Sequence, residues 1–276
     1  MKAKPLLPVV LLAIAVAVAP ACRRQVAVPD PVPPHETFRI ASRALAEDRV
    51  VNVHVPAAYA AHPDSAFAVL YMPDGGIGED FPHIVNTLTA LTEAGDVVPL
   101  IVVGIENTQR RRDMTGPTEV ESDRKIAPVV GGSAAFRAFI RDELMPEIEA
   151  RYRCNGRTGI VGESAAGLFI METFCLEPAL FDTYIALSPS LWWNDHALVR
   201  GAGDSVRRTA SLGLTLYLAA ANETDVSPHV EAFAAVLAQA APADLAWIYV
   251  PRPDLRHDTI YRAESAAAFR AVFAPS

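Results

Sequence analysis

Lysine, cysteine and positive charge are scarce in this chain of 276 residues. Its lysines are Lys2, Lys4 and Lys125, so chemistry that needs a lysine Schiff base has few candidates. The formal net charge of -8 argues against nucleic acid as a partner, because phosphates need a basic surface. The seven histidines and three cysteines do not cluster at metal-ligand spacing. We therefore expect chemistry that requires no metal and no organic cofactor.

The N-terminus has the pattern of an export signal. A basic start precedes an apolar run over 6–18, and small residues up to Ala21 precede Cys22. These features are typical of a secretory signal peptide, here residues 1–21. A cysteine directly after the cut site resembles a bacterial lipoprotein, so we expect Cys22 to be lipidated and to tether the protein in the bacterial cell envelope. The alternative is a soluble periplasmic or secreted protein.

The sequence after this signal indicates a tether followed by one domain. Residues 22–35 are rich in proline and lack apolar periodicity, which favours an extended linker. Residues 36–276 suit a single domain with a substantial core. Cys154 lies ten residues before Ser164 and Cys175 lies eleven residues after it. An oxidising compartment therefore makes a disulfide between the two cysteines plausible. Two separate buried thiols are the alternative.

Apolar runs alternate with helical patterns along this domain. Strands are expected at 37–43, 49–55, 67–72, 100–104, 159–161, 183–187, 214–220 and 246–250. Helices are expected at 81–94, 133–152, 168–176, 230–240 and 261–273, with a kink at Pro146. The pattern predicts an α/β fold with a mostly parallel sheet and an antiparallel start. A long polar connection over 106–130 should lie at the strand ends, where such sheets form their sites.

The stretch 158–169 predicts a strand, a sharp turn and a helix, with Ser164 at the apex. Such a turn strains the backbone of its apex residue. It also brings the second residue before the serine close to the second residue after it, so both must be small. Gly162 and Ala166 meet this condition, although the G-x-S-x-G pattern usually has glycine at the second position. The stretch therefore predicts a nucleophilic serine.

A serine nucleophile needs a base, and the base needs an acid to orient it. On this fold the order along the chain is serine, acid, histidine. His257 is the only histidine after the last predicted strand, so we predict it as the base. The acid is Glu223 or Asp225, both just beyond the strand at 214–220, and Glu223 is preferred.

The tetrahedral intermediate of ester cleavage needs backbone N–H donors for its oxyanion. The N–H of Ala165 follows the serine and is one candidate by position. The second is expected from Gly75 or Gly76, in the loop that leaves the strand predicted beside the serine strand.

Four stretches carry a resemblance to a known family: 70–75 (LYMPDG), 102–115 (VVGIENTQRRRDMT), 161–169 (VGESAAGLF) and 181–193. Together with the segments around Glu223 and His257, they resemble the putative-esterase family of α/β-hydrolases, which includes enterochelin (siderophore) esterases and esterase D-like enzymes. The resemblance implies the α/β-hydrolase fold, with helices on both faces of the sheet.

The resemblance also assigns roles to residues. It implies Ser164 as nucleophile, His257 as base and Glu223 as orienting acid. It further implies that Arg110, Arg112 and Trp193 lie near the substrate mouth, with an Arg–Asp113 pair and core packing as the structural alternatives. Family members usually have histidine where Glu163 stands, so the substrate cannot be carried over from the family.

The sequence thus predicts a serine hydrolase that cleaves small carboxylic esters through an acyl-enzyme. The same three residues would also support acyl transfer to an acceptor other than water. The remaining alternative is a non-catalytic lipoprotein that binds a siderophore or a glycan.

Overall fold

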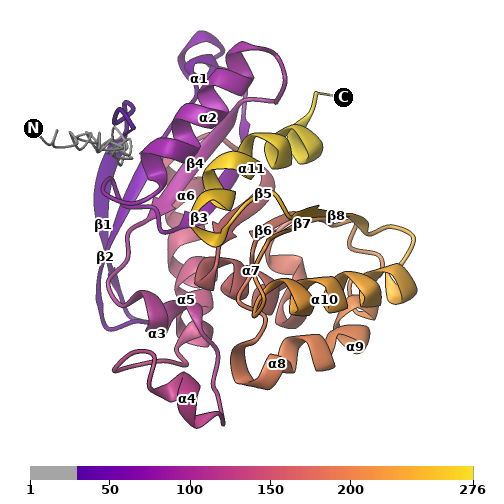
Figure 1. Ribbon diagram of the computed structural model, residues 1–276. Coiled ribbons are helices and arrows are strands. Elements are labelled where there is room, and N and C mark those ends of the chain that lie inside the picture. Colours follow the sequence, from indigo (N-terminus) through magenta and orange to yellow (C-terminus); the bar gives the residue numbers. More distant parts are fainter. Residues whose placement is uncertain (1–29, 276) are drawn as a thin grey trace, which may run out of the picture.

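The computed structural model describes residues 30–275 (Figure 1). The predicted signal peptide, Cys22 and the start of the predicted tether lie outside the described residues. The last residues of the tether, 30–35, lie against the domain. The carbonyl of Pro31 accepts a hydrogen bond from Asn86 Nδ2 at 2.8 Å, and Asp30 pairs with Arg262 at 2.6 Å.

An eight-stranded sheet forms the centre of the domain, in the order β1-β2-β4-β3-β5-β6-β7-β8. The strands are β1 (Glu36–Ser42), β2 (Glu47–His54), β3 (Phe67–Pro73), β4 (Leu100–Ile105), β5 (Cys154–Glu163), β6 (Thr183–Leu187), β7 (Thr215–Ala221) and β8 (Ala246–Arg252). The pairs β1–β2 and β2–β4 are antiparallel, and every other pair is parallel. The predicted mostly parallel sheet with an antiparallel start is confirmed.

Helices cover both faces of this sheet (Figure 1). They are α1 (Ala57–Ala61), α2 (Phe81–Glu93), α3 (Arg110–Met114), α4 (Glu121–Arg124), α5 (Ser133–Phe139), α6 (Met145–Arg151), α7 (Ala165–Leu176), α8 (Trp193–Arg200), α9 (Ala202–Arg207), α10 (Ser227–Ala240) and α11 (His257–Phe273). Successive side chains of the buried strand β3 point to opposite faces of the sheet, so they pack into two separate hydrophobic cores. Leu70 and Met72 pack with α2 and α11, whereas Val69 and Tyr71 pack with the cluster of α5, α7 and α10.

Three segments differ from their predicted form. The connection 106–130 contains α3 and α4 and is less irregular than its polar sequence indicates. The helix predicted over 133–152 is α5 and α6 joined by a π-helical turn, Ile140–Leu144, just before Pro146. Because proline has no N–H to donate, the helix widens before it instead of ending. The closing helix begins at His257 and not at 261, since Arg256 and Thr259 form a reciprocal cap there.

The disulfide that the sequence made plausible is absent, because Cys154 and Cys175 are both free. Cys154 Sγ lies 3.9 Å from the Ile148 carbonyl oxygen of α6, whereas Cys175 is buried within α7. The alternative of two separate thiols is the one that the structure has.

Among residues 30–275, no helix is both long enough and apolar enough to cross a membrane.

Candidate active site

Ser164 stands between the end of β5 and the first residue of α7. Its backbone has φ 61° and ψ -118°, a conformation that costs a non-glycine residue free energy and is typical of functional turns. A Cβ placed on Gly162 would lie only 2.6 Å from the Cβ of Ala166. Alanine is therefore tolerated at 166 because 162 is glycine, which explains the departure from the G-x-S-x-G pattern.

His257 begins α11 and reaches Ser164 from the far end of the chain. Its Nε2 lies 2.9 Å from Ser164 Oγ, and its side chain is 41% exposed. Its Nδ1 lies 2.6 Å from Glu223 Oε2, which is within ion-pair distance, although the oxygen is off the direction of a straight hydrogen bond. A carboxylate beside Nδ1 favours the tautomer with its proton there, and this leaves the Nε2 lone pair toward the serine.

Glu223 lies in the loop after β7, where Ser227 holds the backbone. The Glu223 N–H donates to Ser227 Oγ at 3.0 Å, and that hydroxyl donates to the Ala221 carbonyl. Asp225 is exposed two residues later and makes no ion pair with His257. Of the two acids considered from the sequence, the structure places Glu223 beside the histidine.

Glu163 brings a second carboxyl group to the same imidazole. Its Oε1 lies 3.0 Å from His257 Nε2, on the side of the ring that faces Ser164. Burial raises the pKa of Glu163 to about 8, an effect that Arg110 opposes and Asp74 reinforces. A carboxyl group whose burial disfavours ionisation therefore stands next to the nucleophile.

The oxyanion donors differ in part from those expected. Ala165 is the first residue of α7, where an N–H has no acceptor within the helix and points to the anion-binding end. The expectation for Gly75 is wrong, because its N–H donates to the Ile105 carbonyl at 2.9 Å. Gly76 donates to Glu79 Oε2 at 2.7 Å, so a substrate oxygen would have to displace that carboxylate to use this N–H.

Gly75 serves packing instead. A Cβ there would lie 2.3 Å from the Gly104 Cα, so only glycine lets this loop approach β4.

Arg110 lies at the edge of the site. It forms a bidentate pair with Asp74, through Nε at 2.6 Å and Nη2 at 2.7 Å, and Nη2 is 3.4 Å from the Glu163 carbonyl. Its charge is therefore largely neutralised by Asp74 before any substrate arrives.

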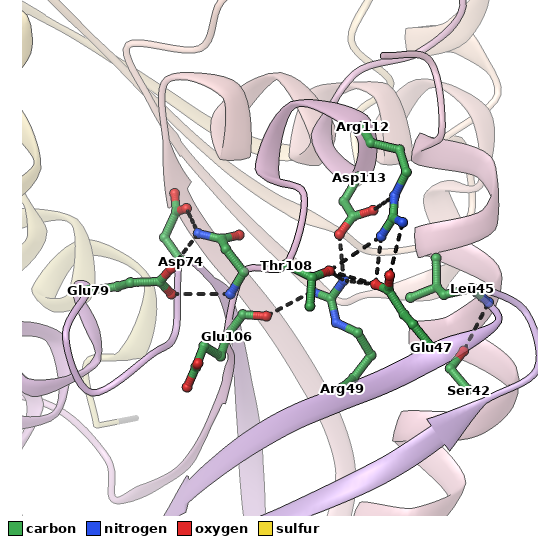
Figure 2. A network of polar contacts seen from close by, with 11 residues as sticks. Ser42, Leu45, Glu47, Arg49, Asp74, Glu79, Glu106, Thr108, Arg112 and Asp113 are labelled. Atoms are coloured by element: carbon green, nitrogen blue, oxygen red, sulfur yellow. Dashed lines mark hydrogen bonds and ion pairs between the residues drawn. The ribbon is translucent and has the colours of Figure 1, made fainter. Parts of the chain in front are cut away.

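Arg112 lines the same surface pocket as Arg110, but its guanidinium is already paired and is not free to bind a substrate. Figure 2 shows its guanidinium between Glu47 and Asp113, with Nη2 at 2.6 Å from Glu47 Oε1 and Nε at 2.6 Å from Asp113 Oδ1. Asp113 also binds Arg49, whose side chain is fully buried. Arg112 thus ties α3 to β2, which corresponds to the structural alternative considered for it.

Trp193 is likewise a core residue, contrary to its expected place at the mouth. It is 5% exposed, and its Nε1 donates to the Gly116 carbonyl at 2.9 Å, so neither its ring nor its polar atom is free. Trp192 beside it is partly exposed.

Arg111, which the sequence pattern does not distinguish from its two neighbours, is the arginine of this loop whose guanidinium could still bind a substrate. It is partly buried and forms no ion pair within residues 30–275. Its burial and the neighbouring Arg110 lower its pKa, while Asp74 and Glu163 act in the opposite sense. Arg111 lines a pocket with Gln109, Arg110 and Arg112 on one side and 127–129 on the other. From the sequence alone, nothing distinguishes which of the three consecutive arginines lacks an ion-pair partner.

Within the described part of the chain, no group of three or more His, Cys, Asp or Glu side chains could hold a metal ion.

Comparison with known sequences finds one family along most of the domain. The profile of the family described as "Putative esterase" matches residues 42–255. Ferri-bacillibactin esterase BesA of Bacillus subtilis is 30% identical over 177 residues, which cover 59% of this chain and 61% of that protein. Siderophore triacetylfusarinine C esterase of Aspergillus fumigatus is 37% identical over 98 residues, which cover 34% of this chain and 32% of that protein. The chain therefore spans less than two thirds of either relative.

Comparison with solved structures agrees. An IroE-like serine hydrolase from Shewanella oneidensis has a TM-score of 0.79 and 30% identity, with 87% of this chain and 80% of that chain covered. Siderophore hydrolase EstA from Aspergillus nidulans has a TM-score of 0.73 and covers 88% of this chain and 96% of that chain. Its identity is 22%, so this second likeness supports the α/β-hydrolase fold alone.

Proposed function

Because the chain belongs to the putative-esterase family, we propose that it is a serine hydrolase that cleaves carboxylic esters through an acyl-enzyme. The observation that carries this proposal is the 2.9 Å contact between Ser164 Oγ and His257 Nε2, on a turn strained at the serine. A fold that only binds a ligand has no need of a serine hydroxyl held against an imidazole in this way.

In the proposed reaction, Ser164 Oγ attacks the ester carbonyl carbon while His257 Nε2 removes the hydroxyl proton. The imidazole becomes positively charged, and the Glu223 carboxylate 2.6 Å from Nδ1 stabilises that charge. The Ala165 N–H stabilises the oxyanion. His257 then returns the proton to the leaving alcohol, which departs and leaves Ser164 acylated.

Water completes the cycle. His257 Nε2 removes a proton from water, the resulting hydroxide attacks the acyl carbon, and Ser164 Oγ leaves with the proton from the imidazolium. Acyl transfer would replace this water by another alcohol at the same step.

The test is covalent labelling of the mature protein with a fluorophosphonate probe, together with hydrolysis of p-nitrophenyl acetate. We expect labelling and hydrolysis in the natural protein and neither in Ser164→Ala. Labelling that persists in Ser164→Ala would overturn the proposal. Product analysis with added alcohols would separate hydrolysis from acyl transfer.

The substrate proposed here is an ester that carries negative charge, such as a siderophore. BesA and the Aspergillus fumigatus esterase are named for siderophores. In this chain, Arg111 offers a guanidinium that forms no ion pair within residues 30–275, and Val129 adds an apolar side chain, 48% exposed, to the same pocket. A planar cation next to apolar surface suits an anionic aromatic group.

Replacing Arg111 with alanine should therefore raise the KM for an anionic ester about 5- to 30-fold, the effect of losing one charge-assisted hydrogen bond. Hydrolysis of neutral p-nitrophenyl acetate should stay unchanged. The measurement is kcat and KM for both esters.

Arg39→Ala is the matched control, since Arg39 is an exposed arginine on the edge strand β1. Equal effects of the two substitutions, or an equal loss with the neutral ester, would refute a role of Arg111 in substrate binding.

The sequence of residues 1–22 adds the proposal that this activity is exported and anchored through Cys22. Mass spectrometry of the mature N-terminus should find a lipidated cysteine there, and an unmodified Cys22 would remove the anchor from the proposal.

A further inference from the structure

His257 Nε2 has two partners that compete for it. Ser164 Oγ is hydrogen-bonded to it at 2.9 Å, and Glu163 Oε1 lies 3.0 Å away, within ion-pair distance but off the direction of a straight hydrogen bond. A neutral imidazole with its proton on Nδ1 has a single lone pair at Nε2, and an imidazolium has a single N–H there. Nε2 therefore serves the serine or the carboxyl group fully, but not both.

Within the described part of the chain, the Oε1 atom of Glu163 has no competing hydrogen-bond partner. Its Oε1 is buried, and within residues 30–275 no hydrogen-bond partner satisfies it. The Glu163 side chain is 16% exposed, so water solvates its carboxyl group only weakly. A buried carboxyl oxygen beside a ring nitrogen is stabilised most when a proton lies between them.

The charges around Glu163 and His257 favour a proton between the carboxyl group and the imidazole. The charged or titratable groups that act on Glu163 and His257 come from every neighbouring loop and helix: Asp74, Asp80, Arg110, Arg111, Glu223, Asp258 and Tyr261. Most of the acids among them disfavour a further negative charge, and burial adds to this by raising the pKa of Glu163 to about 8. Arg110 and Arg111 act in the opposite direction without cancelling the effect.

Whether the proton is bonded to Glu163 Oε1 or to His257 Nε2, the consequence for Ser164 is the same. With a neutral Glu163, its O–H donates to the Nε2 lone pair. With an ionised Glu163, the imidazolium N–H donates to the carboxylate. In both forms Nε2 cannot accept the Ser164 proton.

We propose that Glu163 and His257 hold one shared proton at Nε2, and that the base for Ser164 forms when this proton leaves to solvent. This inference rests on the proposed function, because it assigns Glu163 as a positioning residue that controls the base. The two groups then titrate as one unit, and the pH at which the serine becomes reactive belongs to the pair. The His257 side chain is 41% exposed, so the ring borders solvent.

The experiment measures the rate of fluorophosphonate labelling of Ser164 from pH 5 to pH 10. In the natural protein we expect the rate to rise with pH. In Glu163→Gln, which cannot hold the shared proton, the midpoint of that rise should fall by at least about one pH unit. Glu163→His, which supplies the residue usual in the family, should also lower it.

Glu231→Gln is the matched control. It removes an exposed negative charge on α10 that is not among the groups acting on Glu163 or His257, and it should leave the midpoint nearly unchanged. A structural role of Glu163 would lower the maximal labelling rate but would not move the midpoint.

The outcomes separate the two proposals. Labelling with the same midpoint in the natural protein and in both Glu163 variants would overturn the shared proton and leave the hydrolase proposal intact. Absence of Ser164 labelling at every pH in all variants would overturn the hydrolase itself.

Discussion

Replacement of Ser164 by alanine is expected to lower kcat/KM for a short ester by about 10⁵- to 10⁶-fold, because the acyl-enzyme can no longer form. His257→Ala should cost a similar factor, since the hydroxyl 2.9 Å from Nε2 loses its base. The double variant should lose little more than either single one, because the two residues act as one unit.

The measurement is kcat/KM for p-nitrophenyl acetate with the four proteins of this cycle. Ser122→Ala is the matched control, a serine on the exposed short helix α4, and it should keep full activity. Thermal unfolding should show that all variants are folded. Losses that multiply in the double variant would show that Ser164 and His257 act independently, which contradicts a shared proton-transfer step.

The parts of the site that depend on chain order were predictable. A strand–turn–helix pattern around Ser164 and the position of His257 after the last strand are local signals, and the parallel sheet brings the carboxyl ends of its strands together. The family resemblance and the mostly parallel sheet are confirmed. The strained backbone of Ser164 is made possible by the small residues Gly162 and Ala166, two positions before and after it.

The parts that depend on pairing between distant residues were not predictable. Arg112 is 65 residues from Glu47 in sequence, yet that carboxylate pairs with its guanidinium. The N–H of Gly75 is taken by the Ile105 carbonyl, and the indole of Trp193 is taken by the Gly116 carbonyl. Residue type alone does not reveal which polar group already has a partner.

The same distant pairing gives the largest expected effect on stability. Figure 2 shows Arg49 at the centre of the network, with its side chain fully buried. Its Nη1 lies 2.5 Å from Asp113 Oδ2, and its Nη2 donates to the Glu106 carbonyl at 2.9 Å. Asp113 is buried as deeply and also accepts from Arg112. The two guanidinium groups therefore depend on one carboxylate that water cannot replace.

Asp113→Ala should lower the free energy of unfolding by about 3–5 kcal/mol, because it leaves the Arg49 charge buried without its closest partner. Glu47 lies 3.1 Å from Arg49 and is only partly buried, so it compensates in part. The measurement is urea unfolding at pH 7. Asp204→Ala, which breaks an exposed pair with Arg207, should change stability little. Equal effects of the two substitutions would mean that Asp113 does not stabilise the buried charge. Because α3 carries Arg110, whose Nη2 lies 3.4 Å from the Glu163 carbonyl beside the nucleophile, ester hydrolysis should fall along with stability in Asp113→Ala.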